Sequence, residues 1–283
     1  MTKISGVVVL YNPEENLKKN IESYLDEIER LYVIDNTPNK SNKEKLPLSQ
    51  KIKYIQFNEN KGVSCALNKA AKEAIKEGYK WLLTMDQDSQ FEKGELAKLT
   101  KYIQRNKDEK IGLVCPWHVI ATNPSKPKED IDYPIEVMTS GNIINLEAYK
   151  KVGGYKDWLF IDCIDFDYCM NLNINGYKVV RLNYAELKHH LGDICIKHFL
   201  GRDFVCSNHN YIRRYYMARN IYYICDLYRD NFPDYCQFLK RGLRGQIMNI
   251  ILFEKDKYRK IRNICRGIND YKKGIKGVYS YKN

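Results

Sequence analysis

Buried strands alternate with amphipathic helices through the first 88 residues, and this alternation constrains the fold more than any other feature of the chain. The first two expected strands are short, unbroken apolar runs rich in Val, Ile and Leu, as in strands covered on both faces. The strands are expected at residues 4–10, 31–34, 52–57 and 81–85, with helices at 14–28 and 64–77. Strands that alternate with helices predict a parallel sheet with right-handed crossovers.

Further elements follow with less regular spacing. We expect helices at 95–105 and 165–175, strands at 111–116, 136–146, 178–182 and 186–190, and a surface loop at 121–133. The strand at 136–146 should break at Ser140-Gly141, and from about Tyr211 the pattern is mostly helical and basic. The sequence therefore predicts an α/β body over residues 1–210 and a helical, basic region over residues 211–283.

Positive charge is concentrated at the end of the chain. From Tyr235 to Asn283 there are 13 Lys and Arg against 3 Asp and Glu, which gives +10 of the total of +12. The other 234 residues therefore carry only +2. Whatever partner this charge serves, it should interact mainly with the last fifth of the chain.

Composition also excludes several classes of protein. No apolar run approaches the roughly 20 residues of a membrane-spanning helix, and the first, Val7 to Tyr11, is too short for a secretory signal. The nine cysteines are scattered and include no C-x-x-C pair. That usage favours reduced thiols in a cytoplasm over a disulfide framework or a structural zinc site.

Polar residues follow each of the first four expected strands. They are Tyr11-Asn12, Asp35-Asn36, Asn60-Lys61-Gly62 and Asp86-Gln87-Asp88. Open α/β sheets bind ligands beyond the carboxyl ends of their strands. We therefore expect these residues to form one composite site.

Two carboxylates one residue apart, Asp86 and Asp88, can hold a hard divalent cation that bridges phosphate oxygens. The spacing alone is weak, because it recurs at 130–132, 165–167 and 254–256, and such a pair is usually a solvated loop. The position of Asp86 and Asp88 after the fourth strand favours the metal site.

These motifs resemble family 2 glycosyltransferases with the GT-A fold. The matching segments are Val7 to Pro13, Val33 to Asn36, Asn58 to Val63 and Met85 to Ser89. The D-Q-D-S variant resembles the rhamnosyltransferase branch, as do Thr139 to Asn142, Leu159 to Asp162, His189 to Asp193 and Arg214 to Asn220. The match spans about residues 4–220, and it departs at Leu10, where that branch usually has Thr.

The resemblance implies a Rossmann-like, mostly parallel sheet and an inverting, metal-dependent transfer from a dTDP- or UDP-sugar. The donor suggested by the branch is dTDP-rhamnose, with UDP-galactofuranose or a UDP-hexose as the alternative. The acceptor would be a glycan or polyprenyl-diphosphate-linked glycan, and the ion Mg²⁺ or Mn²⁺. A sugar-nucleotide pyrophosphorylase would need a Gly- and Arg-rich loop where Leu10-Tyr11-Asn12-Pro13 stands, and no RNA-binding motif supports a nucleic-acid partner.

The resemblance also implies roles for the residues at the strand ends. Tyr11 would flank the nucleotide base and Asp35 would accept a hydrogen bond from it, although a core Tyr and a turn Asp are the structural alternatives. Asp86 would contact the ribose and Asp88 the metal. Further donor or acceptor contacts are expected from Asn12, Asn36, Lys61, Gly62, Asn68, Gln87, Ser140 and Gly141.

The general base should lie at the start of the helix at 165–175. An acid pair is usual there in the family; Ile164 replaces its Glu, which leaves Asp165 as the base and Asp167 as a supporting residue that contacts substrate. Asp162 is the rival for the base, and capping is the ordinary alternative for each carboxylate.

His189 matches a family histidine that can complete the metal shell, with His190 and His209 as alternatives. Arg213 and Arg214 could hold the diphosphate, or could form a solvated helix face. Basic residues alternate with apolar ones between Phe238 and Tyr281. This pattern fits peripheral binding to the anionic inner face of the cell membrane, or packing of the helices on the core with a solvated basic face.

Overall fold

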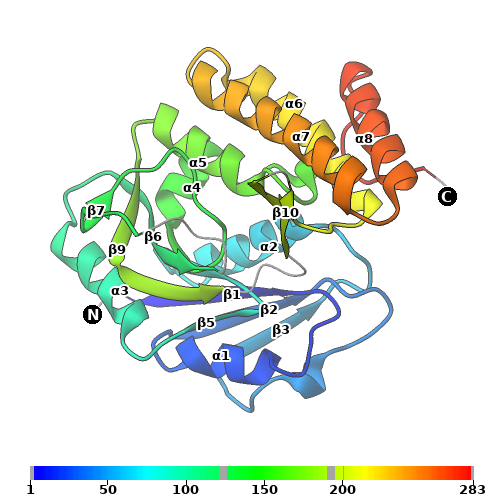
Figure 1. Ribbon diagram of the computed structural model, residues 1–283. Helices are drawn as coiled ribbons and strands as arrows, with labels where there is room; N and C mark the ends of the chain where they lie inside the picture. The colour runs from blue at the N-terminus through cyan, green and yellow to red at the C-terminus, as the bar shows by residue number, and fades with distance from the viewer. Residues whose placement is uncertain (1–2, 121–125, 190–194, 200, 282–283) are drawn as a thin grey trace. The chain divides into compact units, whose positions relative to one another are not determined.

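The computed structural model describes residues 3–120, 126–189, 195–199 and 201–281, in two compact units (Figure 1). The first unit comprises residues 1–155 and 168–190, and the second comprises residues 156–167 and 191–283. Helix α5 (Ile164–Ile174) therefore has its first turn in the second unit and its remainder in the first. The predicted division into an α/β body at residues 1–210 and a helical region at residues 211–283 stays a prediction.

The first four strands of the large sheet are parallel, as predicted. They are β1 (Ile4–Leu10), β2 (Arg30–Asp35), β3 (Ile52–Gln56) and β4 (Trp81–Asp86), in the spatial order β3-β2-β1-β4. Helices α1 (Leu17–Leu25) and α2 (Val63–Lys76) lie on opposite faces of this sheet (Figure 1). Right-handed crossovers require this, because the chain moves outward from β1 to β3 and then returns past β1 to β4.

The remaining strands extend the sheet beyond β4 in the order β8-β6-β9-β5, and β7 pairs with β9. Their bounds are β5 (Ser89–Phe91), β6 (Ile111–Val119), β7 (Ile131–Asp132), β8 (Asn142–Asn145) and β9 (Lys178–His189). β6 and β9 run parallel to each other, whereas β5, β7 and β8 pair antiparallel with their neighbours. The sheet is thus mostly parallel, which confirms the predicted class.

Two expectations about these strands are wrong. The two late strands form one strand, β9, whose pairing with β6 shifts register between Pro116 and Trp117. The strand expected at 136–146 breaks at Ser140-Gly141 as predicted, since Gly141 has a φ of 79°, but residues 136–139 form no strand and only β8 follows the break. The sequence also gave no sign of β5 and β7.

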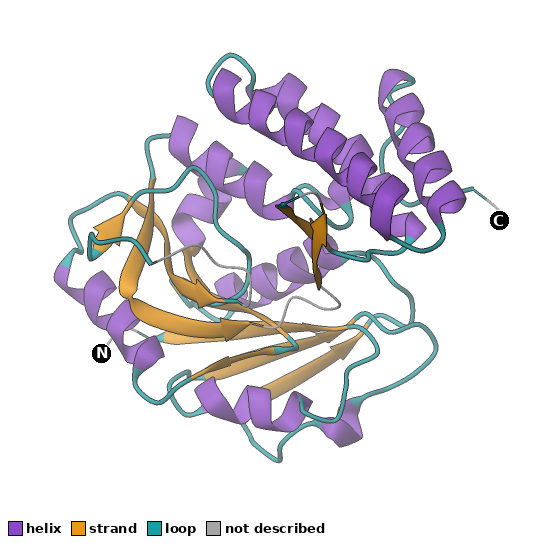
Figure 2. Cartoon of the chain, in the orientation of Figure 1, coloured by secondary structure: helices purple, strands orange, loops and turns teal. Residues whose placement is uncertain are grey.

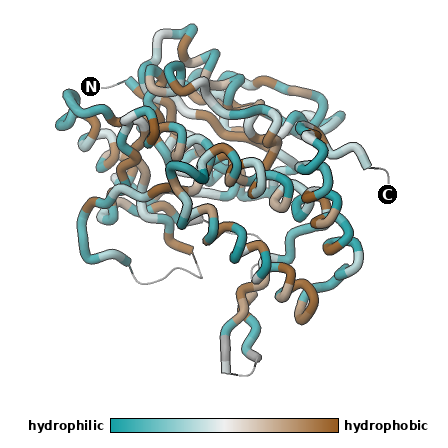
Figure 3. Tube along the Cα trace, turned by 90° about the horizontal axis from the view of Figure 1, so that it is seen from above, coloured by the Kyte–Doolittle hydropathy of each residue, from teal (hydrophilic) through white to brown (hydrophobic). Residues whose placement is uncertain are grey.

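Small residues on α2 allow it to approach the sheet closely. Ala66, Ala70, Ala71 and Ala74 are fully buried, and α2 packs on β1, β2 and β4. Helix α3 (Glu95–Arg105) matches its predicted bounds and packs on β6 and β9, and the short helix α4 (Leu146–Val152) packs on β6 and β8. In Figure 3, hydrophobic colour runs along the strands and alternates with hydrophilic colour along the helices.

The second unit is mainly helical (Figure 2). It contains the turn η2 (Asp157–Leu159), the hairpin β10 (Cys195–Phe199) and β11 (Arg202–Cys206), and helices α6 (Tyr211–Tyr228), α7 (Pro233–Phe253) and α8 (Lys257–Lys272). α8 packs closely on α6, since a Cβ added at Gly267 would lie 2.4 Å from the carbonyl oxygen of Tyr215. Among the described residues, no helix combines the length and apolar character needed to cross a membrane.

Candidate active site

The carboxyl ends of β1 and β4 lie side by side in the sheet. The two strands are neighbours, and the chain reverses its direction of growth between them, which makes this the switch point where such sheets bind ligands. The amide of Tyr11 donates to Oε1 of Gln87 (2.9 Å), and Nε2 of Gln87 donates to the carbonyl of Tyr11 (3.2 Å). These two hydrogen bonds hold the Tyr11 backbone. The residue is 48% exposed, so its ring remains accessible.

Asn12 continues this edge. Its φ of 45° turns the chain sharply after β1, and its amide donates to Oγ1 of Thr37 (2.9 Å). The end of β1 is thereby joined to the end of β2. These two strand ends lie along one edge of the sheet in the first unit, and their use as one binding site stays a prediction.

Asp35 is fully buried at the end of β2 and organises the following loop. Its Oδ1 accepts from the amide of Thr37 (3.0 Å), and its Oδ2 accepts from the amide of Asn42 (2.9 Å) and the hydroxyl of Tyr54 (2.6 Å). Burial raises the pKa of Asp35, but the hydrogen bonds from Tyr54, Asn42 and Thr37 outweigh it and hold the pKa below 3.8. The carboxylate is therefore ionised and structural here, and its contact with a nucleotide base stays a prediction.

Asn36 connects the ends of β2 and β3. Its Oδ1 accepts from the amide of Lys61 (2.8 Å), and its Nδ2 donates to Oδ1 of Asn60 (3.0 Å). Gly62 caps α2 with a φ of 85°, a conformation that favours glycine. The Lys61 side chain is exposed and pairs with Glu59. The amino end of α2 therefore opens at the same edge of the sheet, where such ends favour phosphate.

Ser140 and Gly141 lie behind the end of β4. Oγ of Ser140, which is fully buried, accepts from the amide of Asp86 (3.0 Å). A Cβ added at Gly141 would lie 2.8 Å from Leu187 and 3.0 Å from Pro116, so a larger residue does not fit. Both residues therefore support the acidic end of β4, and their contact with sugar or acceptor stays a prediction.

The acidic pair lies where β4 ends. Asp86 is half-buried and Asp88 is exposed. Ser89 pairs with His189 across β5 and β9, which brings the His189 backbone next to the acidic turn. The side chain of His189, and His190 altogether, lie outside what the structure describes.

Carboxylate oxygens are donors that Mg²⁺ and Mn²⁺ prefer, so Asp86 and Asp88 fit such an ion chemically. Within the described ranges, no group of three or more His, Cys, Asp or Glu side chains could hold a metal. The predicted ligand set thus stays a prediction.

Asn68 has a clear structural role in the first unit. Its Nδ2 donates to the carbonyl of Tyr155 (2.7 Å), and its Oδ1 accepts from the hydroxyl of Tyr149 (2.5 Å) and the amide of Tyr155 (3.1 Å). The side chain is buried. It joins α2 to the segment that follows α4, and its contact with the donor stays a prediction.

In the second unit, the first turn of α5 carries two carboxylates in different environments. Asp165 is half-buried, and its Oδ1 accepts from the amide of Phe166 (3.1 Å). Asp167 is fully buried and accepts from Nζ of Lys156 (2.7 and 2.9 Å) and from the hydroxyl of Tyr228 (2.7 Å). Burial raises the pKa of Asp167, although Lys156 and Tyr228 oppose the shift. Of the two, Asp165 is the more accessible to a substrate.

The two arginines that were expected to hold diphosphate have carboxylate partners. Nε and Nη2 of Arg213 each donate to Oδ1 of Asp162 (3.0 Å), and 41% of the Arg213 side chain is exposed. Arg214 is buried and donates to Oε1 of Glu254 (2.7 Å), whose Oε2 accepts from Lys260 (2.8 Å). Arg213 thus remains partly accessible, whereas Arg214 joins α6 to the turn between α7 and α8.

His209, the third candidate for the metal shell, lies just before α6. Burial, together with the smaller effect of the nearby cations Arg213, Arg214 and Lys260, lowers the pKa of His209 to about 3. The imidazole is therefore neutral at physiological pH, which is the form that binds metals.

Two residues of α6 for which the sequence predicts no individual role are central to this unit. Arg219 and Asn220 are fully buried, and both donate to carbonyls between Trp158 and Asp162. The Arg-Asn pair lies between aromatic and apolar residues of α6, but the sequence alone does not show that it is buried.

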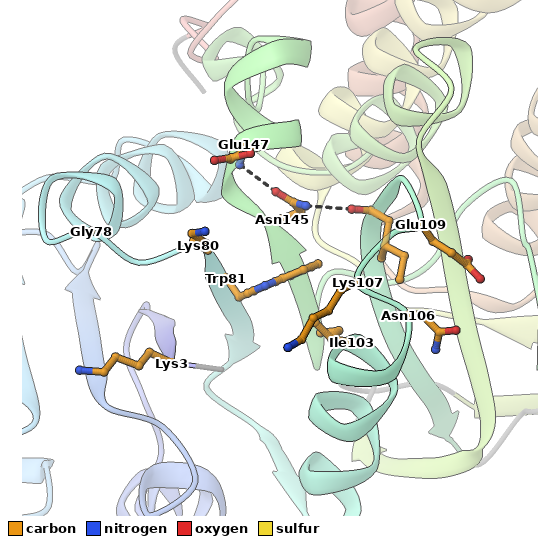
Figure 4. Close-up of a pocket in the computed structure, with 11 residues that line it drawn as sticks. Lys3, Gly78, Lys80, Trp81, Ile103, Asn106, Lys107, Glu109, Asn145 and Glu147 are labelled. Carbon is orange, nitrogen blue, oxygen red and sulfur yellow. Dashed lines mark hydrogen bonds between the residues drawn. The ribbon is translucent and has the colours of Figure 1, made fainter. Parts of the chain in front are cut away.

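A cavity of about 550 Å³ lies elsewhere in the first unit (Figure 4). It is lined by Trp81 and Ile111, which begin β4 and β6, and by Asn145, which ends the antiparallel β8. Nδ2 of Asn145 donates to the carbonyl of Ile111 (3.1 Å). The cavity is thus at the amino ends of the parallel strands and contains none of the predicted site residues.

Comparison with known proteins assigns the chain to a family. The model of glycosyl transferase family 2 matches residues 5–163. The dTDP-rhamnosyl transferase RfbF of Shigella flexneri is 27% identical over 246 residues, which cover 78% of this chain and 79% of that protein.

Two solved structures share the fold at 14% sequence identity. GalNAc-T7, crystallised with UDP, GalNAc and Mn²⁺, matches 97% of this chain and 56% of its own with a TM-score of 0.61. S. aureus TarS matches 95% of this chain and 43% of its own with a TM-score of 0.56. The chain thus spans about half the length of these two proteins, and the GT-A fold is confirmed. From its motifs, its sheet and its family match, the chain belongs to glycosyl transferase family 2 and is a glycosyltransferase similar to a dTDP-rhamnosyl transferase.

Proposed function

We propose that the protein is an inverting, metal-dependent rhamnosyltransferase. It would move L-rhamnose from dTDP-rhamnose to a hydroxyl of a glycan or polyprenyl-diphosphate-linked glycan in surface polysaccharide synthesis. The observation that carries the proposal is the meeting of Tyr11, Gln87 and the acidic turn at the ends of β1 and β4. The similarity to a dTDP-rhamnosyl transferase favours rhamnose over the alternatives, UDP-galactofuranose and UDP-hexoses.

The donor would bind along the carboxyl edge of the sheet. The exposed ring of Tyr11 supplies a surface on which a pyrimidine can stack. Lys61 and the amino end of α2 supply positive charge for a phosphate. Asp35 and Asn36 hold the two loops in place, whether or not they also touch the nucleotide.

Asp165 would act as the general base. It takes the proton from the acceptor hydroxyl as the oxygen attacks the anomeric carbon, and the diphosphate leaves from the opposite face, so the anomeric configuration inverts. Asp162 is the weaker candidate because Arg213 engages both of its oxygens. Asp167 is weaker still because it is fully buried.

Asp88 and His189 would hold Mg²⁺ or Mn²⁺, with Asp86 next to them at the ribose. Such an ion, when bound, offsets the negative charge that develops on the diphosphate. Support comes from the oxygen donors at the end of β4 and from the pairing of Ser89 with His189.

The second unit would make peripheral contact with an anionic membrane. Lys255, Lys257, Arg259 and Arg262 are exposed at the turn between α7 and α8 and on α8. Lys260 and Ile264 of α8 are buried, so one face of this helix packs while the other carries the charge. Basic surfaces of this kind bind anionic lipids.

A donor screen tests the proposal most directly. Nucleotide release would be measured with dTDP-rhamnose, UDP-galactofuranose and UDP-hexoses, with and without EDTA. We expect turnover with dTDP-rhamnose that EDTA abolishes and Mn²⁺ or Mg²⁺ restores. Turnover with a UDP-sugar alone would show that the alternative donor is the correct one. Turnover that persists in EDTA would show that the reaction needs no metal.

A further inference from the structure

The segment that precedes α5 has an unusual backbone. Phe160, Asp162 and Cys163 all have φ between 61° and 67°, although none is glycine. Phe160, with a ψ of −62°, is the centre of a γ-turn that the Ile161 amide closes on the Leu159 carbonyl (2.8 Å). This hand of γ-turn is rare and strained, and such backbone persists only where its surroundings determine it.

Asn220 of α6 supplies the main restraint. Its Nδ2 donates to the carbonyls of Leu159 (2.9 Å), Ile161 (2.9 Å) and Asp162 (3.0 Å). Because the Asn220 side chain is buried, these three hydrogen bonds form away from water. One side chain therefore fixes the direction of three carbonyls in four residues.

Neighbouring residues of α6 hold the same segment. Nη2 of Arg219 donates to the carbonyl of Trp158 (2.9 Å). The ring of Tyr216 stacks on Phe160 with 4.8 Å between centroids and an angle of 10°. Arg213, one further turn along, binds the Asp162 carboxylate. The restraint thus covers both the backbone and the side chains of the turn.

Asp165 comes three residues after Asp162, the last residue of this turn. On its other side, Asp167 is held by Tyr228, which is also on α6. The position of Asp165 is therefore set from both sides by one helix. We propose that Asn220 is a positioning residue: by holding the strained turn at residues 159–162, it keeps Asp165 in place for proton transfer before substrate binds. This inference rests on the proposed role of Asp165.

The test compares Asn220→Ala with Asn263→Ala in the full chain. Asn263 is a matched control because it is also a buried asparagine on a helix of the second unit, but its Nδ2 donates within its own helix, to the carbonyl of Arg259. The measurements are kcat per donor-binding site, counted by titration with dTDP, the donor KM, and the pH profile of kcat. We expect Asn220→Ala to lower kcat about 100-fold, within the range for loss of a general base. The donor KM should stay within a few-fold, and the acid limb of the profile should move.

Equal losses in the two variants, or an unchanged pH profile with the lower kcat, would overturn the positioning role in favour of general stabilisation. Should Asn220→Ala fail to fold, Asn220→Ser keeps a donor hydroxyl and takes its place in the same comparison. Asp165→Asn separates the two hypotheses. If it retains wild-type turnover, the proposed base is wrong; if it is inactive while Asn220→Ala is not, only the positioning role is wrong.

Discussion

The hydroxyl of Tyr228 donates a hydrogen bond of 2.7 Å to Asp167, which joins the first turn of α5 to α6 over 61 residues of sequence. Lys156 binds the same carboxylate, and the Asp167 side chain has no exposed surface. A buried carboxylate of this kind is costly to ionise even when it is paired.

Replacement of Asp167 by Asn should change how stability depends on pH. The folded-state pKa of Asp167 lies above 3.8, so the folded state binds its proton more tightly than the unfolded state does. Its contribution to stability is therefore greatest below pH 3.8 and is lost as pH rises through the raised pKa. Urea unfolding at several pH values should show that the free energy of unfolding of Asp167→Asn increases relative to that of the wild type as pH rises. Parallel curves for the two proteins would contradict this.

Asp35 should behave in the opposite way. Its folded-state pKa is below 3.8, so its stabilisation is present above that pH and is lost as pH falls through the lowered pKa. In Asp35→Asn, an amide would face the donors of Asn42 and Tyr54, which should cost about 2–3 kcal/mol at pH 7. The same unfolding measurement checks it: the deficit should shrink in acid. A deficit that is constant from pH 7 to pH 3 would show that ionisation of Asp35 is irrelevant to stability.

Asp165→Asn should lower kcat by roughly 10²–10⁴-fold with little change in donor KM. Asp157→Asn is the control, since Asp157 is an exposed carboxylate in the preceding turn. Steady-state assays of nucleotide release, together with dTDP titrations, measure both quantities. Near wild-type transfer by an Asp165→Asn protein that still binds donor would eliminate this residue as the base.

Asp88→Asn should raise the Mn²⁺ concentration needed for half-maximal activity by about tenfold or more, because a carboxylate ligand is lost. Asp130→Asn provides the matched control: Asp130 is exposed and belongs to a second pair of acids with the same spacing. Metal titrations of EDTA-treated protein give the two midpoints. Identical midpoints would place the metal, if one is used, on other residues.

Removal of exposed charge from the second unit should weaken binding to anionic vesicles. The variant replaces Lys255, Lys257, Arg259 and Arg262 by Ala. The control replaces four exposed lysines of the first unit, Lys18, Lys19, Lys40 and Lys43. Co-sedimentation with phosphatidylserine vesicles should fall at least about tenfold in the variant alone and should be weak with neutral lipid. Equal binding of the two proteins would reject this surface.

The sheet could be predicted in detail up to β4, because each strand and helix there is specified by local periodicity. Beyond β4 the prediction weakened for physical reasons. β9 is one strand because its partner β6 absorbs the irregularity with a register shift, and nothing local to residues 178–189 reveals that. The three-residue strand β5 forms only because β9 offers it a partner.

The sequence by itself determined the α/β class, the grouping of polar residues at the strand ends and the family, because hydrophobic patterns and short motifs are local along the chain. Tertiary structure alone decided what the individual side chains do. Nothing local in the sequence shows that Asp167, and not Asp165, is fully buried against Lys156 and Tyr228. Likewise, Asn220 binds carbonyls about 60 residues earlier in the chain. Burial and long-range hydrogen bonds depend on which distant elements meet, and no window of sequence contains both partners.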